Sequence, residues 1–289
     1  TSKGDRAMNS LTLQIRSIGA GVVTLLLAMA IVAFGVLSWT DATAAVEDTR
    51  HNLGSSSTVT GANSFSGTAA VCVFCHTPHG GSTSAAVPLW NRNLADPASY
   101  TTYATLNSAT LEGAEAPVGS VSIACLSCHD GTQAMDTVLN EPGSGIDNPT
   151  YSAGVWSGAN QTAGQLNAGA ITNLTSDLSN DHPIGIQYGG GGITAAAPTA
   201  ATNDPDFTAP GTTDLNGTTV WWVDSETTPN GTREKTDMLL YTRSVAGIDS
   251  GALQPFVECA SCHDPHTTNA TFLRTSNDGS AVCLACHSK

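Results

Sequence analysis

The placement of the cysteines constrains this chain more than any other feature. All eight cysteines fall into C-x-x-C pairs, and a histidine directly follows each pair. We number these units motifs one to four in chain order. They are Cys72/Cys75 with His76, Cys125/Cys128 with His129, Cys259/Cys262 with His263, and Cys283/Cys286 with His287. No cysteine is left over for another purpose.

This spacing is that of covalent c-type haem attachment. Two thiols must add to two vinyl groups on one edge of a porphyrin, and positions three apart on a helical turn place both sulfurs on one face. The next residue lies on that same face, where its imidazole can bind the iron from the proximal side. The pattern therefore predicts four covalently attached haem c groups, each held by one motif.

Three other uses of paired cysteines explain less of the pattern. Zinc sites built from four cysteines need no histidine after every pair. Disulfides in an exported protein would also leave the four histidines unexplained. A thioredoxin-like redox motif is expected once in a chain rather than four times.

The four remaining histidines match the four predicted haems one to one. They are His51, His79, His182 and His266. We predict that they are the second, distal iron ligands. Methionine is the rival distal ligand, but only Met135 and Met238 lie beyond the first 44 residues, too few for four haems. Iron bound by two histidines has no open coordination position, so we expect electron transfer and no enzymatic activity.

Two of these histidines stand directly behind a motif. His79 follows motif one after only two residues, and one of these is a proline that holds the link extended. His79 therefore cannot reach the far face of its own haem, and His266 stands behind motif three in the same way. We predict that His79 binds the haem of motif two and His266 that of motif four. His51 and His182 are then left for motifs one and three.

The chain also contains an internal repeat. Motifs one and three read C-x-x-C-H-x-P-H, and motifs two and four read C-L-x-C-H. One histidine stands upstream of each half, in "HNLG" (51–54) and "DHPIG" (181–185). We predict two dihaem halves, 45–150 and 151–289, within a single domain organised around the haems.

The composition favours little regular structure. Aromatic residues are 6% and charged residues 12% of the chain, while glycine, threonine, asparagine and alanine fill the loop-rich insert of the second half. We predict a fold that is mostly irregular coil, with short helices around the haem motifs and a few short β-strands. One β-hairpin is expected from 218–225 and 236–244, joined by a Pro-Asn-Gly turn. Its adjacent Trp221 and Trp222 would point to opposite faces.

The first 44 residues form a separate region. From Ile18 to Trp39 the chain carries no charge, and basic residues precede this run. The length suits a bilayer span, whereas the basic start and the Ala42-Thr43-Ala44 sequence suit a cleaved export signal. Residues 1–44 are therefore predicted to be a signal peptide or an N-terminal membrane anchor. Either way we expect export, to the extracellular space or cell surface, or else to a periplasmic or membrane-anchored position.

The charge of the chain excludes one class of partner. The formal net charge is −14, and no basic patch is present to hold phosphates, so we expect no nucleic-acid binding.

Six segments together resemble one known family. They are "HNLG", "CVFCHTPHG", "CLSCHDG", "DHPIG", "CASCHDPH" and "CLACHSK". In this order they are similar to the OmcE-like tetrahaem cytochromes, from about Val46 to His287, with the glycine- and threonine-rich stretches unmatched. The resemblance implies extracellular filaments with a continuous haem chain, in which an adjacent subunit donates one distal histidine. The long leader departs from the family pattern.

Two function classes follow, with a third kept open. The first is long-range electron transfer as the subunit of an extracellular cytochrome filament, a conductive nanowire. The second is a discrete periplasmic or membrane-anchored tetrahaem electron carrier, and the third is a multihaem reductase with one five-coordinate iron. The predicted partners are copies of the chain in a head-to-tail homopolymer, together with upstream and downstream redox proteins or extracellular acceptors. His51 lies on a short, flexible arm near the proposed cleavage site, so we predict that it binds a haem of the adjacent subunit.

Overall fold

A computed structural model describes residues 45–143, 148–226 and 228–288. The predicted signal peptide or anchor, residues 1–44, lies outside the described residues. Ala44–Lys289 forms one compact unit. Within the described ranges, no helix is both long enough and apolar enough to cross a membrane.

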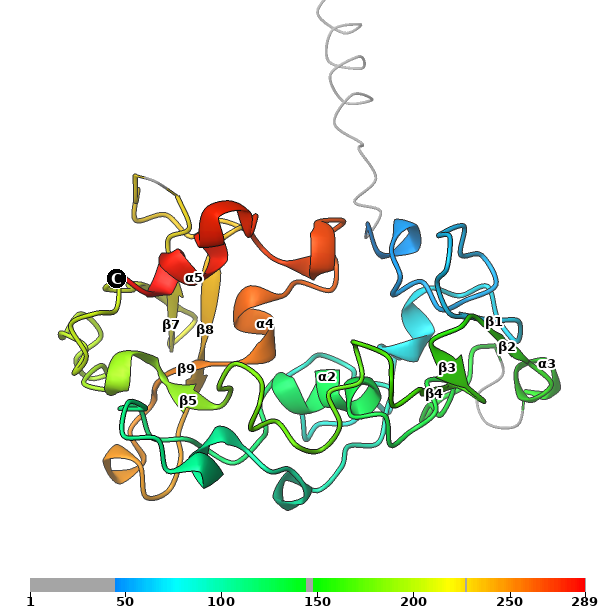
Figure 1. Ribbon diagram of the computed structural model, residues 1–289, viewed down its shortest axis with the longest axis horizontal. Coiled ribbons are helices and arrows are strands. Elements are labelled where there is room, and N and C mark those ends of the chain that lie inside the picture. The colour runs from blue at the N-terminus through cyan, green and yellow to red at the C-terminus, as the bar shows by residue number, and fades with distance from the viewer. Residues whose placement is uncertain (1–44, 144–147, 227, 289) are drawn as a thin grey trace, which may run out of the picture. The chain divides into compact units, whose positions relative to one another are not determined.

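Irregular chain dominates the described part, with short helices and strands between the loops (Figure 1). The α-helices are α2 (Ser122–His129), α3 (Pro149–Ser152), α4 (Cys259–Cys262) and α5 (Ala281–Cys286). The single-turn 3-10 helices are Ala45–Asp48, Cys72–Phe74, Pro97–Ser99, Tyr103–Leu106, Tyr188–Gly190, Asp249–Gly251, Ala270–Phe272 and Asp278–Ser280. This is the coil-rich architecture that the composition predicts, and it is compatible with a haem-binding cytochrome.

Each C-x-x-C-H motif lies on a helical turn, as predicted. Motif one begins on the 3-10 turn Cys72–Phe74, and motifs two, three and four lie on α2, α4 and α5. The backbone N–H of His76 donates to the Cys72 carbonyl at 2.8 Å, which continues the turn as far as the histidine. Equivalent bonds join motif three and motif four internally. This turn places the second cysteine and the histidine on the face of the first cysteine.

The main sheet contains five antiparallel strands in the order β5-β9-β8-β7-β6. Their bounds are β5 Ile186–Gln187, β6 Gly211–Leu215, β7 Thr218–Val223, β8 Met238–Arg243 and β9 Gln254–Val257. The predicted hairpin is confirmed as β7 and β8, which pair Trp221 with Leu240 and Trp222 with Leu239. Both tryptophans are buried. Trp221 belongs to an apolar cluster that also contacts Cys262 and Cys286, so this sheet forms the wall behind motifs three and four.

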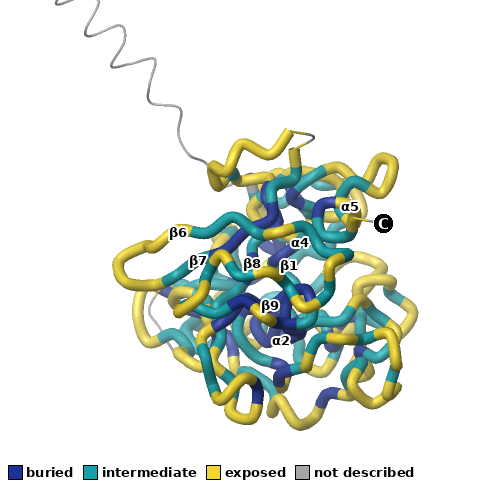
Figure 2. The backbone as a smooth tube through the Cα atoms, turned by 90° about the vertical axis from the view of Figure 1, so that its left-hand side faces the viewer, coloured by how far each residue is buried: buried dark blue, intermediate teal, exposed yellow. Residues whose placement is uncertain are grey.

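A second apolar cluster supports motifs one and two. Phe65 and Phe74 are almost completely buried, and they pack with Tyr151, Leu166 and the sulfur-bearing Cys75 and Cys128. Strand β1 (Ser64–Phe65) pairs with β2 (Trp156–Ser157), and β3 (Gln161–Thr162) pairs with β4 (Gln165–Leu166). Segments on both sides of residue 150 therefore share one core. The most buried backbone lies along α2 and β9 (Figure 2).

Candidate haem sites

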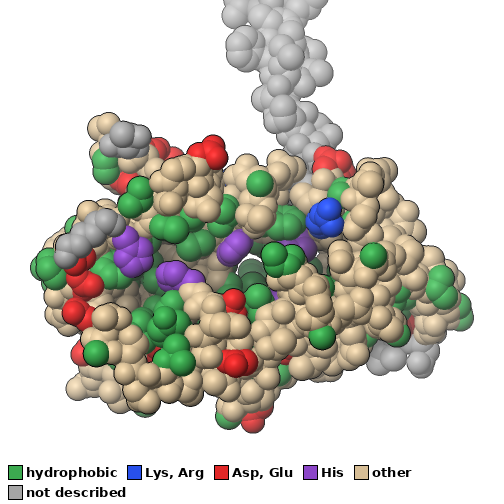
Figure 3. Space-filling model, viewed as in Figure 1, with side chains coloured by type: hydrophobic (Ala, Val, Ile, Leu, Met, Phe, Trp, Pro, Cys, Tyr) green, Lys and Arg blue, Asp and Glu red, His purple; other side chains and the backbone are tan. Residues whose placement is uncertain are grey.

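Histidines gather along a hollow in one face of the protein. In Figure 3 several imidazoles lie there among apolar side chains. A porphyrin presents large apolar faces and binds iron through imidazole nitrogens. The surroundings of these histidines therefore suit such a group.

Three of the four proximal histidines are held by their Nδ1 atoms. Nδ1 of His76 lies 2.8 Å from the Pro88 carbonyl oxygen, and that of His129 lies 2.8 Å from the Thr172 carbonyl oxygen. His263 makes the same contact with Thr271 at 2.9 Å. A carbonyl only accepts, so Nδ1 carries the proton and Nε2 keeps its lone pair. This is the orientation that a metal-binding imidazole requires.

Two histidine pairs have a ring spacing that fits an iron between them. The ring centres of His51 and His129 are 6.1 Å apart, and those of His76 and His266 are 6.3 Å apart. A metal–imidazole bond is about 2.0–2.1 Å long and the ring centre lies roughly 1 Å beyond the nitrogen, so two imidazoles on one metal have centres about 6 Å apart. The rings cross at 69° in the first pair and at 19° in the second.

His51 is fixed from two sides by residues that follow motif three. The Phe272 ring stacks on the imidazole at 4.1 Å and 15°, and the Pro265 carbonyl accepts a hydrogen bond from it. Burial, followed by the neighbouring His129, lowers the pKa of His51 to about 4. The neutral imidazole that binds metals is therefore the form present at neutral pH.

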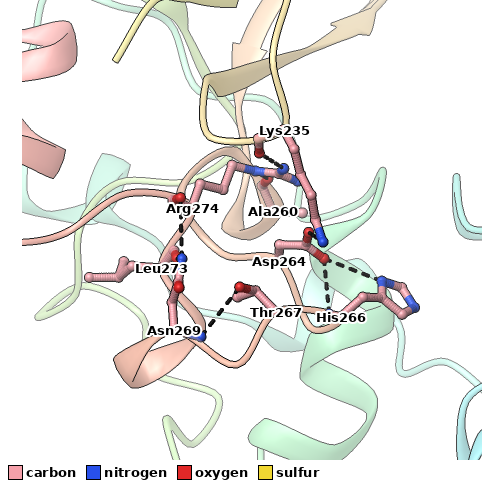
Figure 4. A network of polar contacts seen from close by, with 8 residues as sticks. All are labelled: Lys235, Ala260, Asp264, His266, Thr267, Asn269, Leu273 and Arg274. Atoms are coloured by element: carbon pink, nitrogen blue, oxygen red, sulfur yellow. Dashed lines mark hydrogen bonds and ion pairs between the residues drawn. The ribbon is translucent and has the colours of Figure 1, made fainter. Parts of the chain in front are cut away.

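An acidic side chain orients His266 (Figure 4). One oxygen of Asp264 accepts the His266 backbone N–H at 2.9 Å and lies 3.3 Å from the imidazole Nδ1. Lys235 lies 3.8 Å from the other oxygen, and the buried Arg274 ties the same loop to the Ala260 carbonyl. A carboxylate on Nδ1 fixes the ring and makes Nε2 a stronger ligand.

Three further histidines, His182, His79 and His263, are exposed and differ in their neighbours. His182 is exposed and contacts the Pro183 carbonyl at 2.9 Å. It lies near motif four, since its charge is the second cause, after burial, of the lowered pKa of His287. His79 and His263 are both exposed, and no ring contact joins either of them to another aromatic or histidine ring in the described ranges.

The cysteines of successive motifs lie next to one another. Burial and then the charge of Cys128 raise the pKa of Cys75 to about 12, which joins motif one to motif two. A hydrogen bond with Cys259 raises the pKa of Cys125 and joins motif two to motif three. Cys262, whose pKa is raised first by burial and then by Cys283, joins motif three to motif four. The four motifs therefore follow one another in space in their chain order.

These histidine pairs differ from the pairing predicted from the sequence. That prediction gave His266 to motif four and left His51 for motif one or three, whereas the structure places His266 opposite His76 and His51 opposite His129. The physical reason is the path of the chain. Motif three lies beside motif two, and the loop that follows it brings His266 back to motif one. His79 is not brought to motif two by any ring contact among the described residues.

Sequence reasoning missed the groups that orient the ligands. Asp264 could have been found, since it stands between two histidines in "CHDPH". Pro88, Thr172 and Thr271 act through carbonyl oxygens, which leave no signal in side-chain identity. Phe272 has a positive φ of 58°, and this strained backbone presents its ring to His51.

Residues 254–289 match the family described as the doubled CXXCH motif. The match covers motifs three and four. No curated protein matches the chain significantly. The paired motif indicates a multihaem c-type cytochrome, a class that binds haem c covalently and takes part in electron transport.

The residues present fit that cofactor. Paired cysteines on helical turns would hold the porphyrin edge, and oriented imidazoles would bind the iron from one or both sides. The haem supplies one-electron redox chemistry when bound. The chain contributes the order of the motifs, the apolar lining, and the carbonyl and carboxylate contacts that hold Nδ1.

Proposed function

We propose that this protein carries electrons along four c-type haems, each bound by two histidines, and that it does so as the subunit of an extracellular cytochrome filament. Support comes from the sequential contacts between the four motifs, which would hold the haems in a continuous row. Two bis-histidine sites fit the ring geometry directly, and His182 lies near motif four.

The polymer part of this proposal depends on one observation. Within the described part of a single chain one distal histidine, His79, would have no haem to bind, and the haem of motif three would have no distal histidine. Three distal histidines lie near the proximal histidine of another motif within the same chain. Among the described residues His79 has no such partner, and His263 lies near His51 but makes no ring contact with it, since His51 lies against His129. A single chain therefore has an exposed imidazole at motif one and an incomplete ligand set at motif three. Each defect would be completed by a second copy.

The internal repeat indicates which residue reaches across. The upstream histidines His51 and His182 lie near motifs two and four, so the second half repeats the first at a step of two haems. His266, behind motif three, reaches back two haems to motif one. His79 stands behind motif one in the same way. If it also reaches back by two haems, it meets motif three of the preceding copy in the row. We therefore assign the intersubunit ligand to His79 in place of His51, which lies against its own His129.

A contact of this kind does not close on itself. One surface of each copy offers His79 and a different surface offers the haem of motif three. Such a heterologous contact generates an open filament unless its rotation happens to close a ring. Metal–ligand bonds across the junction would add stability beyond that of polar surface contacts.

The haem number is tested by mass. The intact purified protein is expected to exceed its polypeptide mass by four haems, and acid–acetone extraction should leave the colour on the protein. An increment of two haems would contradict attachment at all four motifs and remove the stoichiometric argument for the distal histidines.

The polymer is tested by His79→Gly, with His182→Gly as a matched control in a second exposed histidine. We expect the wild type to form fibres in electron micrographs, and His79→Gly to give monomers with one high-spin haem. Free imidazole should restore the low-spin spectrum of that variant without restoring fibres. His182→Gly should also gain one high-spin haem but still polymerise. Fibres formed by His79→Gly would contradict the assignment.

The incomplete ligand set at motif three also favours a second candidate function. If the protein works as a monomer, the iron of motif three keeps an open position and could bind nitrite or cyanide, as in a multihaem reductase. Native protein that stays monomeric and binds cyanide at one iron would support this alternative. A monomer with four low-spin irons would instead support a discrete electron carrier.

A further inference from the structure

Arg92 is a fully buried cation with no acidic partner among the described residues. Its side chain is 0% exposed. Nε donates to the Ser127 hydroxyl at 3.2 Å, and Nη2 donates to the Ser127 and Ala134 carbonyls at 2.8 and 3.0 Å. Nη1 donates to the Met135 carbonyl at 2.8 Å. All of these acceptors are neutral, so they satisfy the N–H groups without cancelling the charge.

This charge lies between motif one and motif two. The neighbouring Asn91 N–H donates to the Cys75 carbonyl at 2.8 Å, and Ser127 directly precedes Cys128. Arg92 itself bonds Ser127 through both Nε and Nη2. The arginine is therefore held against the residue that precedes Cys128 in motif two and directly follows the residue that bonds Cys75 in motif one.

The other largely buried arginines differ in this respect. Arg243, near motif three, forms an ion pair with Glu258 at 2.8 Å. Arg274 lies close enough to Asp264 to lower the pKa of that carboxyl. Each of these two arginines has a carboxylate partner, whereas Asp130 and Asp136, which lie in the neighbourhood of Arg92, form no ion pair with it. Among the described residues, a buried arginine without an ion pair is thus found beside motifs one and two.

We propose that Arg92 raises the reduction potentials of the haems on motifs one and two relative to those on motifs three and four. The inference rests on the proposed haem attachment. When bound, a ferric haem would be reduced by one electron from a ferrous neighbour, which would be oxidised to ferric, with no bond or proton transferred. The ferric state carries one more positive charge, so a buried cation nearby disfavours it. Burial keeps this interaction from being screened by solvent and salt.

The test is Arg92→Gln, with Arg92→Lys as a control that keeps the charge. Haem content is first verified by intact mass, and the four potentials are then measured by redox titration followed by visible and electron paramagnetic resonance spectra. We expect two potentials to fall in Arg92→Gln, with the ferric-to-ferrous ratio at a fixed poise rising roughly tenfold for a charge about 10 Å from the iron at an effective dielectric constant near 20. Arg92→Lys should stay near the wild type.

The outcomes separate this inference from the proposed function. Missing haem mass in the wild type would overturn the haem proposal itself. Four haems with unchanged potentials in Arg92→Gln would overturn the role of Arg92 alone. If Arg92→Gln does not fold, the wild-type titration decides. The haems of motifs one and two, identified by their near-parallel and crossed imidazoles, must then have higher reduction potentials than the other two. The reverse order refutes the inference.

Discussion

Glu258 joins the helices of motifs two and three, and its removal should destabilise the protein strongly. The side chain is 1% exposed. One carboxylate oxygen accepts from Arg243 Nη1 at 2.8 Å, and the other accepts from the Ser122 hydroxyl at the start of α2. The carboxylate also accepts a backbone N–H in the first turn of α4. One residue therefore connects α2, β8 and α4.

The size of the effect follows from what Glu258→Ala leaves behind. Removing one member of a buried ion pair costs about 3–5 kcal/mol. The remaining Arg243 keeps a bond to the Pro117 carbonyl and 14% exposure of its side chain, which favours the lower end of that range. Loss of the helix cap adds about 1 kcal/mol. We expect Glu258→Ala to lower the free energy of unfolding by about 4 kcal/mol.

Burial raises the pKa of Glu258 despite the opposing effects of Ser122 and Arg243. The ionised carboxylate is therefore less favourable here than in the unfolded chain. The ion pair of Glu258 and Arg243 thus adds no net stability, although removing one partner alone is costly. Replacing both members, with Arg243→Met and Glu258→Gln, should consequently cost less than Glu258→Ala alone.

The assay is guanidinium unfolding of the holoprotein, followed by tryptophan fluorescence that the haems quench in the folded state. At a slope of about 4 kcal/mol/M, the expected loss shifts the midpoint by about 1 M. Glu112→Ala, at an exposed position, should stay within about 0.5 kcal/mol of the wild type. A Glu258→Ala midpoint that matches this control would refute the reasoning.

Three further predictions concern the ligands and their support. His266→Gly should convert one of the predicted haems to high spin without loss of haem mass, since the thioether bonds remain; four low-spin irons would contradict the facing pair with His76. The crossed rings of His51 and His129 should give one strongly anisotropic low-spin resonance in the wild type, and it should vanish in His51→Ala. Asn91→Ala removes a buried amide that bonds Val73 and Asn140 and should lower the free energy of unfolding by about 2–3 kcal/mol.

The local features of this protein could be predicted from its sequence. The helical turns at the motifs follow from the need to place two thiols and an imidazole on one face. The β7–β8 hairpin follows from alternating apolar residues around a Pro-Asn-Gly turn. Both depend on residues that are close together in the chain.

The long-range features could not be predicted in the same way. Strands β5, β6 and β9 are short, and β9 contains Pro255, so they carry no periodic signal of their own. The histidine pairs depend on how the chain folds back on itself. This fold brings His51 beside the loop after motif three, where it stacks on Phe272, which lies 221 positions later in the sequence (272 − 51 = 221). Spacing along the sequence favours neighbouring motifs, and that preference gave His266 to motif four.

Because His79 would have no iron within its own chain and the iron at His263 would have no distal ligand, the two ends of a filament of these chains would differ. In the proposed filament, one terminus ends in an iron with an open position and the other ends in an unused imidazole. The number of such irons stays at one per filament whatever its length. The high-spin fraction of the iron therefore falls as the reciprocal of the number of subunits and measures mean length in solution. A small iron ligand added during assembly would occupy the open terminus and stop growth there, while the opposite terminus continued to add subunits.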